Sequence, residues 1–220
     1  MIELIIFDLD GTLLNTLDDL AVSANYALRQ HGYPEHELNA YRYFVGNGIT
    51  KLIERALPEE ARREDIILRL RKEFVTYYQR HKTDLSHPYP GITELLTQLR
   101  RQKIRLAVAS NKYQQGTREL IDHFFERNLF SVVLGQRENI PVKPDPAIVL
   151  EILKQTGIKK SATLYVGDSG VDMQTARNSG LTSIGVTWGF RPRQELEENG
   201  ACYLVDTPEE IKEKLTNFIP

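Results

Sequence analysis

The chain has 220 residues, of which 41% are hydrophobic and 26% are charged, enough for one ordinary domain or for a core domain with a modest insert. Its 28 Lys and Arg residues nearly balance its 30 Asp and Glu residues, which gives a formal net charge of -2. This balance argues against nucleic acid and anionic membranes as partners, because both require clustered positive charge. Nothing in the composition indicates an obligate protein partner.

The N-terminus and the single cysteine bear on the cellular compartment. The first residues include neither a basic segment nor a small-residue cleavage site, so we expect no signal peptide. No apolar run approaches the ~18 residues that a membrane-spanning helix needs. Cys202 has no second cysteine with which to form a disulfide, which suits the reducing cytoplasm. We interpret residues 200–205 as a short buried strand in which Cys202 is structural.

The first predicted element is a strand over the apolar residues 4–7, and a helical block follows it. From residue 16 to about residue 88 we find helical patterns and no convincing strand. The predicted helices cover residues 17–30, 49–56 and 59–81, and we expect the charge of the third to form a solvated face. We therefore expect a cap domain over residues 16–87 and a catalytic core over residues 1–15 and 88–220. Residues 14–16 and 87–91 are the expected connections.

Beyond the block, short apolar runs alternate with helical periodicity. Such runs are typical of strands buried on both faces, and the alternation predicts an open α/β parallel sheet with helices on both faces, a Rossmann-like core. The predicted strands are residues 104–109, 132–134, 163–166 and 183–186. The predicted helices are residues 92–102, 114–125, 146–157, 171–179 and 208–218.

Polar residues follow four of the predicted strands. In open α/β sheets, ligands bind at the carboxyl ends of the strands, so these residues should meet at one edge. Taken singly, each segment has an ordinary interpretation as a turn, a calcium-type loop or a helix cap. The ordered set is what predicts catalysis. Its members are Asp8-Leu9-Asp10-Gly11-Thr12, Ser110-Asn111-Lys112, Lys143-Pro144 and Gly167-Asp168-Ser169.

Three carboxylates in this set predict a metal site. Asp8 and Asp10 are two residues apart and would share a side in extended geometry, and Asp168 would join them at the sheet edge. Buried carboxylates are costly to ionise without a compensating cation. Mg²⁺ is the natural candidate, because it prefers a few carboxylates together with water and substrate phosphate.

The same residues suit phosphoryl transfer to a carboxylate. An anionic nucleophile and a phosphate repel each other by ~4 kcal/mol per charge pair at about 4 Å and an effective dielectric near 20, so counter-charge is required. Mg²⁺ and Lys143 would supply it. Ser110 and Thr12 would donate hydroxyl hydrogen bonds to the phosphate, and Gly11 would allow its close approach to the backbone.

Two carboxylates allow a division of labour. Asp8 would attack phosphorus, while Asp10 would protonate the leaving oxygen and then accept a proton from the attacking water. The result is a pair of displacements through an aspartyl-phosphate.

These motifs resemble those of the haloacid dehalogenase-like hydrolase superfamily along essentially the whole chain. The matching residues are Asp8-Leu9-Asp10-Gly11-Thr12, Ser110, Lys143 and Gly167-Asp168-Ser169 with Asp172. The resemblance implies that Asp8 is the nucleophile and Asp10 the acid/base. It further implies that Mg²⁺ is held by Asp8, the Asp10 backbone carbonyl and Asp168, with Asp172 and Ser169 in support. The helical block resembles a small C1-type cap.

Within that superfamily the chain resembles the phosphoglycolate phosphatases, which implies 2-phosphoglycolate as the substrate. The supporting segments are residues 45–48, 54–57, 89–91 and 185–189. In Gly46-Asn47-Gly48, backbone N–H groups would face a substrate carboxylate, and Lys51 would add charge; a flexible glycine turn is the alternative. Asn15 departs from the resemblance, because many capped members carry Asp at this hinge position.

Other functions share this pattern. A sugar-phosphate phosphatase or a phosphomutase like β-phosphoglucomutase would use the same site, and the motifs do not separate these outcomes. A dehalogenase needs no metal site for phosphate. A receiver-type signalling module also joins an acceptor Asp to acids, a hydroxyl and a lysine, but it lacks a second acid two residues on and has no helical insert. The sequence leaves the exact small phosphorylated metabolite, the oligomeric state and the pathway open.

Overall fold

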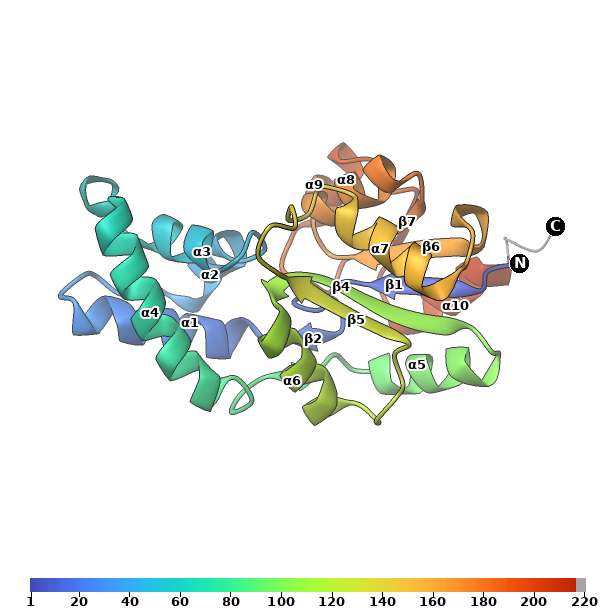
Figure 1. The fold of residues 1–220 in the computed structure, drawn as a ribbon, viewed down its shortest axis with the longest axis horizontal. Coiled ribbons are helices and arrows are strands. Elements are labelled where there is room, and N and C mark those ends of the chain that lie inside the picture. Colours follow the sequence, from blue (N-terminus) through green and yellow to red (C-terminus); the bar gives the residue numbers. More distant parts are fainter. Residues whose placement is uncertain (217–220) are drawn as a thin grey trace.

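The structure is a computed structural model that describes residues 1–216, and its centre is a six-stranded sheet (Figure 1). The strand order is β5-β4-β1-β6-β7-β8, and every neighbouring pair is parallel. The predicted parallel sheet is therefore confirmed. Its strands are β1 (Leu4–Phe7), β4 (Arg105–Tyr113), β5 (Val132–Gln136), β6 (Thr163–Gly167), β7 (Thr182–Val186) and β8 (Tyr203–Val205).

Helices cover both faces of this sheet because its central strand is apolar on both faces. In β1, Ile5 and Phe7 pack into one apolar cluster, whereas Leu4 and Ile6 pack into another on the opposite face. The first cluster includes residues of α5 (Ile92–Arg101), α6 (Gln114–Phe124) and α10 (Pro208–Thr216). The second includes residues of α7 (Ala147–Thr156) and α8 (Gly170–Ser179). This three-layer arrangement leaves the carboxyl ends of the strands free to carry a site.

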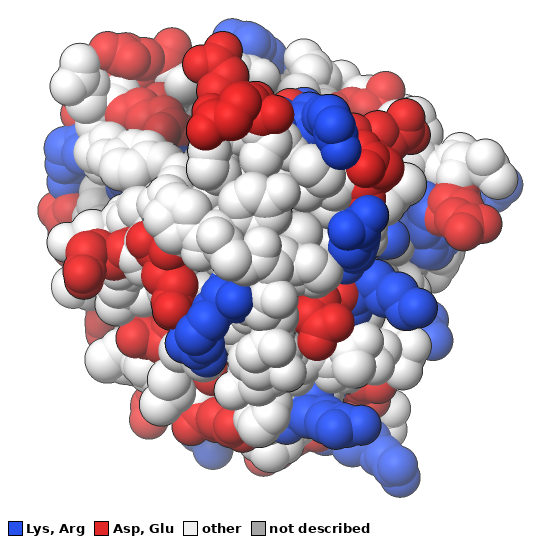
Figure 2. All heavy atoms as spheres, turned by 90° about the vertical axis from the view of Figure 1, so that its left-hand side faces the viewer, with Lys and Arg blue, Asp and Glu red and all other residues white. Residues whose placement is uncertain are grey.

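A separate group of helices lies beyond the carboxyl ends of the strands, at the left in Figure 1. It consists of α1 (Leu17–Gln30), α2 (Leu38–Phe44), α3 (Ile49–Ala56), the 3₁₀ turn Glu59–Ala61 and α4 (Glu64–His81). These elements share an apolar cluster of their own, which Phe190 of the other part of the chain joins. In Figure 2, which views this end of the molecule, acidic and basic side chains are interspersed around an uncharged centre.

The helical group is tied to the sheet by two adjacent segments. The antiparallel strands β2 (Leu14–Asn15) and β3 (His87–Pro88) pair with each other there. The buried Asp19 of α1 accepts hydrogen bonds from the Leu85 and Ser86 N–H groups and from the Ser86 hydroxyl, the last at 2.6 Å. We expected no strand between residue 16 and about residue 88, and that expectation is wrong at its end, because β3 forms there and pairs with β2.

Several boundaries differ from the predictions. The helix predicted over residues 59–81 is split, with an extended Arg63 before α4, and α2 and α9 (Arg193–Glu198) were not predicted. Both are short, so they leave little periodicity to detect.

Cys202 is exposed and precedes β8, so the buried-strand interpretation of this residue is wrong. The predicted helix 208–218 is described as far as Thr216, and its last two residues lie outside the described residues. Across residues 1–216, every helix is too short or too polar to traverse a bilayer.

Candidate active site

A pocket opens between the helical group and the carboxyl ends of the strands. Its core wall contains most of the polar residues predicted from the strand ends, and its opposite wall is mainly apolar. The core residues are Asp8, Asp10, Ser110, Asn111, Lys112, Tyr113, Lys143, Asp168, Ser169, Phe190 and Arg191. The opposite wall contains Leu20, Val45, Gly46, Gly48, Ile49, Leu52, Phe74 and Tyr78.

Three buried carboxylates converge at the base of this pocket. Asp8 follows β1, Asp168 follows β6 and Asp172 lies in the first turn of α8; one oxygen from each lies within 4.8 Å of the other two. Such a buried group of hard oxygen donors fits a divalent cation such as Mg²⁺. Asp168 is also closely enclosed, since a Cβ atom on Gly11 or Gly189 would overlap its side chain.

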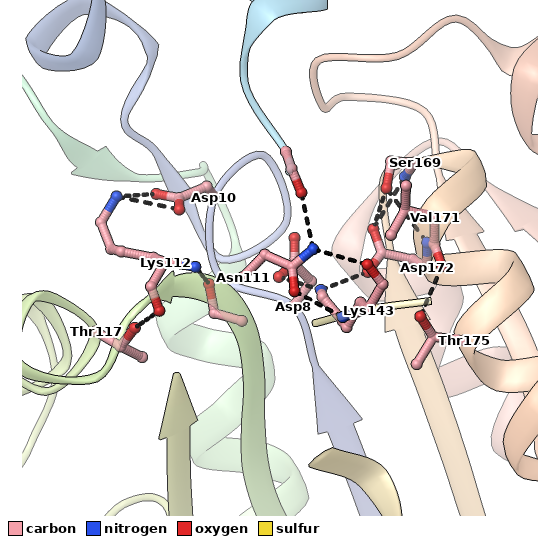
Figure 3. Close-up of polar contacts among 12 residues, drawn as sticks. Asp8, Asp10, Asn111, Lys112, Thr117, Lys143, Ser169, Val171, Asp172 and Thr175 are labelled. Atoms are coloured by element: carbon pink, nitrogen blue, oxygen red, sulfur yellow. Dashed lines mark hydrogen bonds and ion pairs between the residues drawn. The ribbon is translucent and has the colours of Figure 1, made fainter. Parts of the chain in front are cut away.

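Lys143 lies between two of these acids (Figure 3). Its Nζ is 2.7 Å from an oxygen of Asp8 and 2.7 Å from an oxygen of Asp172, and it donates to the Tyr165 hydroxyl at 3.2 Å. The Lys143 side chain is only 3% exposed. Asn111 fixes its backbone from both sides, because its amide oxygen accepts from the Lys143 N–H and its amide nitrogen donates to the Lys143 carbonyl.

A single ammonium does not balance these acids. Burial raises the pKa of Asp8 to about 7, against the opposing effect of Lys143, and the Asp172 charge raises it further. Burial also raises the pKa of Asp168 well above its ordinary value, with the charges of Asp172 and Asp8 adding to the effect. Burial opposes the charged form of Lys143 too, but Asp172 and Asp8 raise its pKa well above its usual value. The group is therefore short of positive charge, as expected for a site that receives a cation.

Asp10 lies apart from this cluster. Its carboxylate accepts a hydrogen bond from the Thr16 hydroxyl at 2.6 Å and forms an ion pair with Lys112, whose Nζ is 3.0 and 3.1 Å from the two oxygens. The strand β1 ends at Phe7 and the chain bends at Leu9, between the two acids, so the extended geometry assumed for Asp8 and Asp10 does not persist. The structure thus joins Asp172, rather than the Asp10 side chain, to Asp8 and Asp168.

The predicted hydroxyl groups lie in different surroundings. Ser110 lines the pocket, and its Oγ accepts from the Lys112 N–H at 3.1 Å, which leaves its own hydrogen for another acceptor. Ser169 caps α8 and binds Asp172 at 2.6 Å. Thr12 is buried outside the lining, and its Oγ has no hydrogen-bond partner among residues 1–216. The structure therefore brings Ser110, but not Thr12, to the pocket wall.

The predicted loop on the helical side is only partly turned toward the pocket. Gly46 and Gly48 line it, whereas the Asn47 amide oxygen accepts from Arg55 outside it. Lys51 is not brought into the pocket, because its side chain is 55% exposed and its Nζ is 2.6 Å from Glu54. We expected the Lys51 ammonium to add positive charge to the substrate site, but it is paired with Glu54 on the same helix.

Three contacts at the pocket, made by Lys112, Arg191 and Phe190, were not predicted from the sequence. Lys112 belongs to one of the predicted strand-end segments, but its ion pair with Asp10 was not predicted. Arg191 joins the two sides of the pocket, because its guanidinium donates to the carbonyls of Val45, at 2.9 Å, and Arg42. The neighbouring Phe190 N–H donates to Asp168 at 2.7 Å. Short apolar and basic segments such as these give no local signal of such long-range contacts.

Comparison with known proteins agrees with this geometry. The family described as haloacid dehalogenase-like hydrolase matches residues 5–186. A phosphoglycolate phosphatase of Vibrio parahaemolyticus is 33% identical over 217 residues, which cover 96% of this chain and 95% of that protein. One from Aliivibrio fischeri is 34% identical over 203 residues, 90% of this chain and 89% of that protein. The crystal structure of a predicted phosphoglycolate phosphatase from Haemophilus somnus superposes with a TM-score of 0.91 at 31% identity, covering 97% and 98% of the two chains.

The match extends over most of the described chain and includes the residues that meet at the strand ends. Asp8, Lys143 and Asp168 all fall within residues 5–186. The chain therefore belongs to the haloacid dehalogenase-like hydrolases and, within them, is a phosphatase that acts on phosphoric monoesters.

Proposed function

We propose that this phosphatase hydrolyses a small phosphorylated metabolite, with 2-phosphoglycolate as its preferred substrate, in a Mg²⁺-dependent reaction through an aspartyl-phosphate on Asp8. The observation that carries the proposal is the placement of Asp8. Its carboxylate lines the pocket, 2.7 Å from the Nζ of Lys143 and beside Asp168 and Asp172. The phosphoglycolate phosphatases at 33% and 34% identity support the choice of substrate.

The residues present fit a magnesium ion. Asp8 and Asp168 would hold it together with the Asp10 backbone carbonyl, and Asp172 would support the site through Lys143 and Ser169. When bound, Mg²⁺ neutralises charge on the phosphoryl oxygens and keeps the Asp8 carboxylate ionised.

The reaction would need two displacements at phosphorus. In the first, a carboxylate oxygen of Asp8 forms a bond to phosphorus while the bond to the ester oxygen breaks, and a protonated Asp10 gives its proton to that oxygen, which leaves as the alcohol. In the second, water gives a proton to Asp10 and attacks phosphorus, which releases inorganic phosphate and restores the Asp8 carboxylate. Lys143 and the Ser110 hydroxyl would hold the non-transferring oxygens.

The wall opposite Asp8 favours a compact ester. It is built from apolar side chains such as Leu52 and Phe74, and Asn111 and Arg191 bind its backbone carbonyls across the pocket. A closed, mainly apolar wall excludes large substrates and bulk water. We retain residues 16–87 as the cap, with residues 1–15 and 88–220 as the catalytic core. Their separate apolar clusters support this division. We also retain the cytoplasm as the compartment.

A screen of phosphate release over small phosphate esters tests the proposal. We expect 2-phosphoglycolate to give the highest kcat/KM, and we expect a chelator to abolish turnover and added Mg²⁺ to restore it. Release of free phosphate separates hydrolysis from a mutase reaction, which would return the phosphoryl group to the sugar. A low rank for 2-phosphoglycolate would refute the substrate, and full activity with chelator would refute the metal.

Without a metal, the protein should lose stability as the pH rises. The folded-state pKa of Asp8 is about 7 against an ordinary 3.8, and that of Asp168 is raised too. The folded state therefore binds more protons than the unfolded state between pH ~4 and ~7, so the free energy of unfolding falls across this window. The raised pKa of Lys143 has no effect here, because its ammonium stays charged in both states.

Thermal unfolding measures this effect. In chelator, we expect Tm to be at least about 5 °C lower at pH ~7.5 than at pH ~5.5, and Mg²⁺ to raise Tm more at the higher pH. Asp168→Asn should give a higher metal-free Tm than the unsubstituted protein at pH ~7.5 and should lose the response to Mg²⁺. An equal or higher metal-free Tm at the upper pH would contradict the prediction.

A further inference from the structure

We infer that Lys112 determines substrate specificity: its ammonium binds a second anionic group of the substrate, such as a carboxylate, which replaces Asp10 as its partner. The inference rests on the proposed function, because it assumes that Asp10 transfers protons in the same pocket. It assigns the recognition of the second anion to a side chain at the end of β4, rather than to the loop at Gly46.

The charges on the pocket wall single out Lys112. Among the described residues that line the pocket, the cations are Lys112, Lys143 and Arg191. Lys143 is held by Asp8, Asp172 and Tyr165 at the base of the pocket. The Arg191 guanidinium is bound to backbone carbonyls of the opposite wall. Lys143 keeps Asp172 as a partner when Asp8 reacts, whereas Asp10 is the single carboxylate that pairs with Lys112 among the described residues and would also transfer protons in the reaction.

The surroundings of Lys112 favour a bound anion. Its side chain is only 4% exposed, and its Nζ lies 5.0 Å from the centre of the Tyr78 ring, which contributes a cation–π contact but no negative charge. A buried ammonium needs a counter-ion. Asp10 supplies that charge in this structure, with both carboxylate oxygens within 3.1 Å of Nζ.

The position of Lys112 also fits this role. Figure 3 shows the Lys112–Asp10 pair on one side of Asp8 and the Lys143–Asp172 pair on the other. A phosphoryl group at Asp8 would therefore have Lys143 on one side and Lys112 on the other. The adjacent Asn111 donates to the Gly46 carbonyl at 3.0 Å, so Lys112 lies where the two walls of the pocket meet. An ester with a carboxylate close to its phosphate would place one anion near each lysine.

This arrangement couples recognition to proton transfer. When a substrate carboxylate binds Lys112, the Asp10 carboxylate is released from the ion pair, takes up a proton from solvent and becomes free to turn toward the leaving oxygen. An ester without a second anion offers Lys112 no replacement, so Asp10 must leave a buried ammonium unpaired. Such an ester should react slowly even when its phosphate binds well.

Two matched esters test this coupling. 2-Phosphoglycolate carries a carboxylate, and 2-hydroxyethyl phosphate carries a neutral hydroxymethyl group at the same position. In Lys112→Met we expect kcat/KM for 2-phosphoglycolate to fall about 30- to 100-fold, the loss expected for a charged hydrogen bond. For 2-hydroxyethyl phosphate we expect kcat/KM not to fall, because Asp10 no longer has to leave a buried ammonium unpaired.

Control variants separate specificity from a structural effect. Lys112→Arg keeps the charge and should retain most of the discrimination. Lys72→Met removes an exposed lysine of α4 and should change neither ester. If Lys112→Met does not fold, Lys112→Gln provides the same comparison with a neutral side chain.

The outcomes are distinct. Equal losses for both esters in Lys112→Met, or an unchanged ratio, would overturn the role of Lys112 in specificity. If the unsubstituted protein does not prefer 2-phosphoglycolate to 2-hydroxyethyl phosphate, the proposed substrate itself fails. A preserved preference that does not depend on Lys112 would leave the proposed function intact and refute only this inference.

Discussion

Replacing Asp8 with asparagine is expected to lower kcat by roughly 10⁴-fold or more, the scale seen when a covalent nucleophile is removed. The amide has almost the shape of the carboxylate but cannot form the phosphoryl bond. Because Asp8 lines the pocket beside Lys143 and Asp168, the loss should be in kcat rather than in folding. Phosphate release from 2-phosphoglycolate measures it directly.

The fate of the phosphoenzyme gives a second readout of the same step. After a rapid acid quench, radiolabelled substrate should leave label on the unsubstituted chain and none on Asp8→Asn. Asp10→Asn should retain its label longer, since Asp10 would activate the water of the second displacement. The Asp10 side chain lies outside the acidic cluster, so this variant leaves the three clustered carboxylates in place. Label on Asp8→Asn, or substantial residual turnover by it, would rule out Asp8 as the acceptor.

The largest stability effect is expected for Lys143→Met. The Lys143 side chain is 3% exposed, and its Nζ lies 2.7 Å from oxygens of both Asp8 and Asp172. Its removal leaves buried carboxylates without their counter-charge, and breaking a buried ion pair from one side typically costs about 3–5 kcal/mol. Urea unfolding in chelator should show this loss as a lower midpoint with an unchanged slope.

A double-mutant cycle with Asp172→Asn identifies the cause. If the cost arises from the unpaired charge, the double variant should be less destabilised than the sum of the two single variants, by about 1–3 kcal/mol. Lys154→Met, at an exposed position on α7, is the matched control and should change stability by less than about 0.5 kcal/mol. A loss below about 1 kcal/mol for Lys143→Met would show that this ion pair contributes little.

The framework of the molecule was predictable because its strands are short, apolar and buried on both faces. Residues 4–7 are an example, since all four are fully buried in β1. The same reasoning located Asp8, Lys143 and Asp168, because residues that follow parallel strands meet at one edge. Local patterns were sufficient for these features.

Features that depend on tertiary contacts were not predictable in this way. The side chain of Asp10 turns toward Lys112, a residue 102 positions away, because the strand ends at Phe7 and the chain bends at Leu9. The resemblance to known hydrolases, rather than any pattern of spacing, brought Asp172 into the site. The helix α9 was missed because it has six residues and buries only Leu196, too little for periodicity to register.

The packing of Asp168 between Gly11 and Gly189 limits how this site can change during evolution. At either glycine, the atom that any other amino acid would add falls on the space that Asp168 already fills. Gly11 also adopts a backbone conformation that other residues rarely accept. A single substitution at either position would displace the acid before any new function could compensate. Divergence among descendants of this enzyme should therefore accumulate on the opposite wall of the pocket.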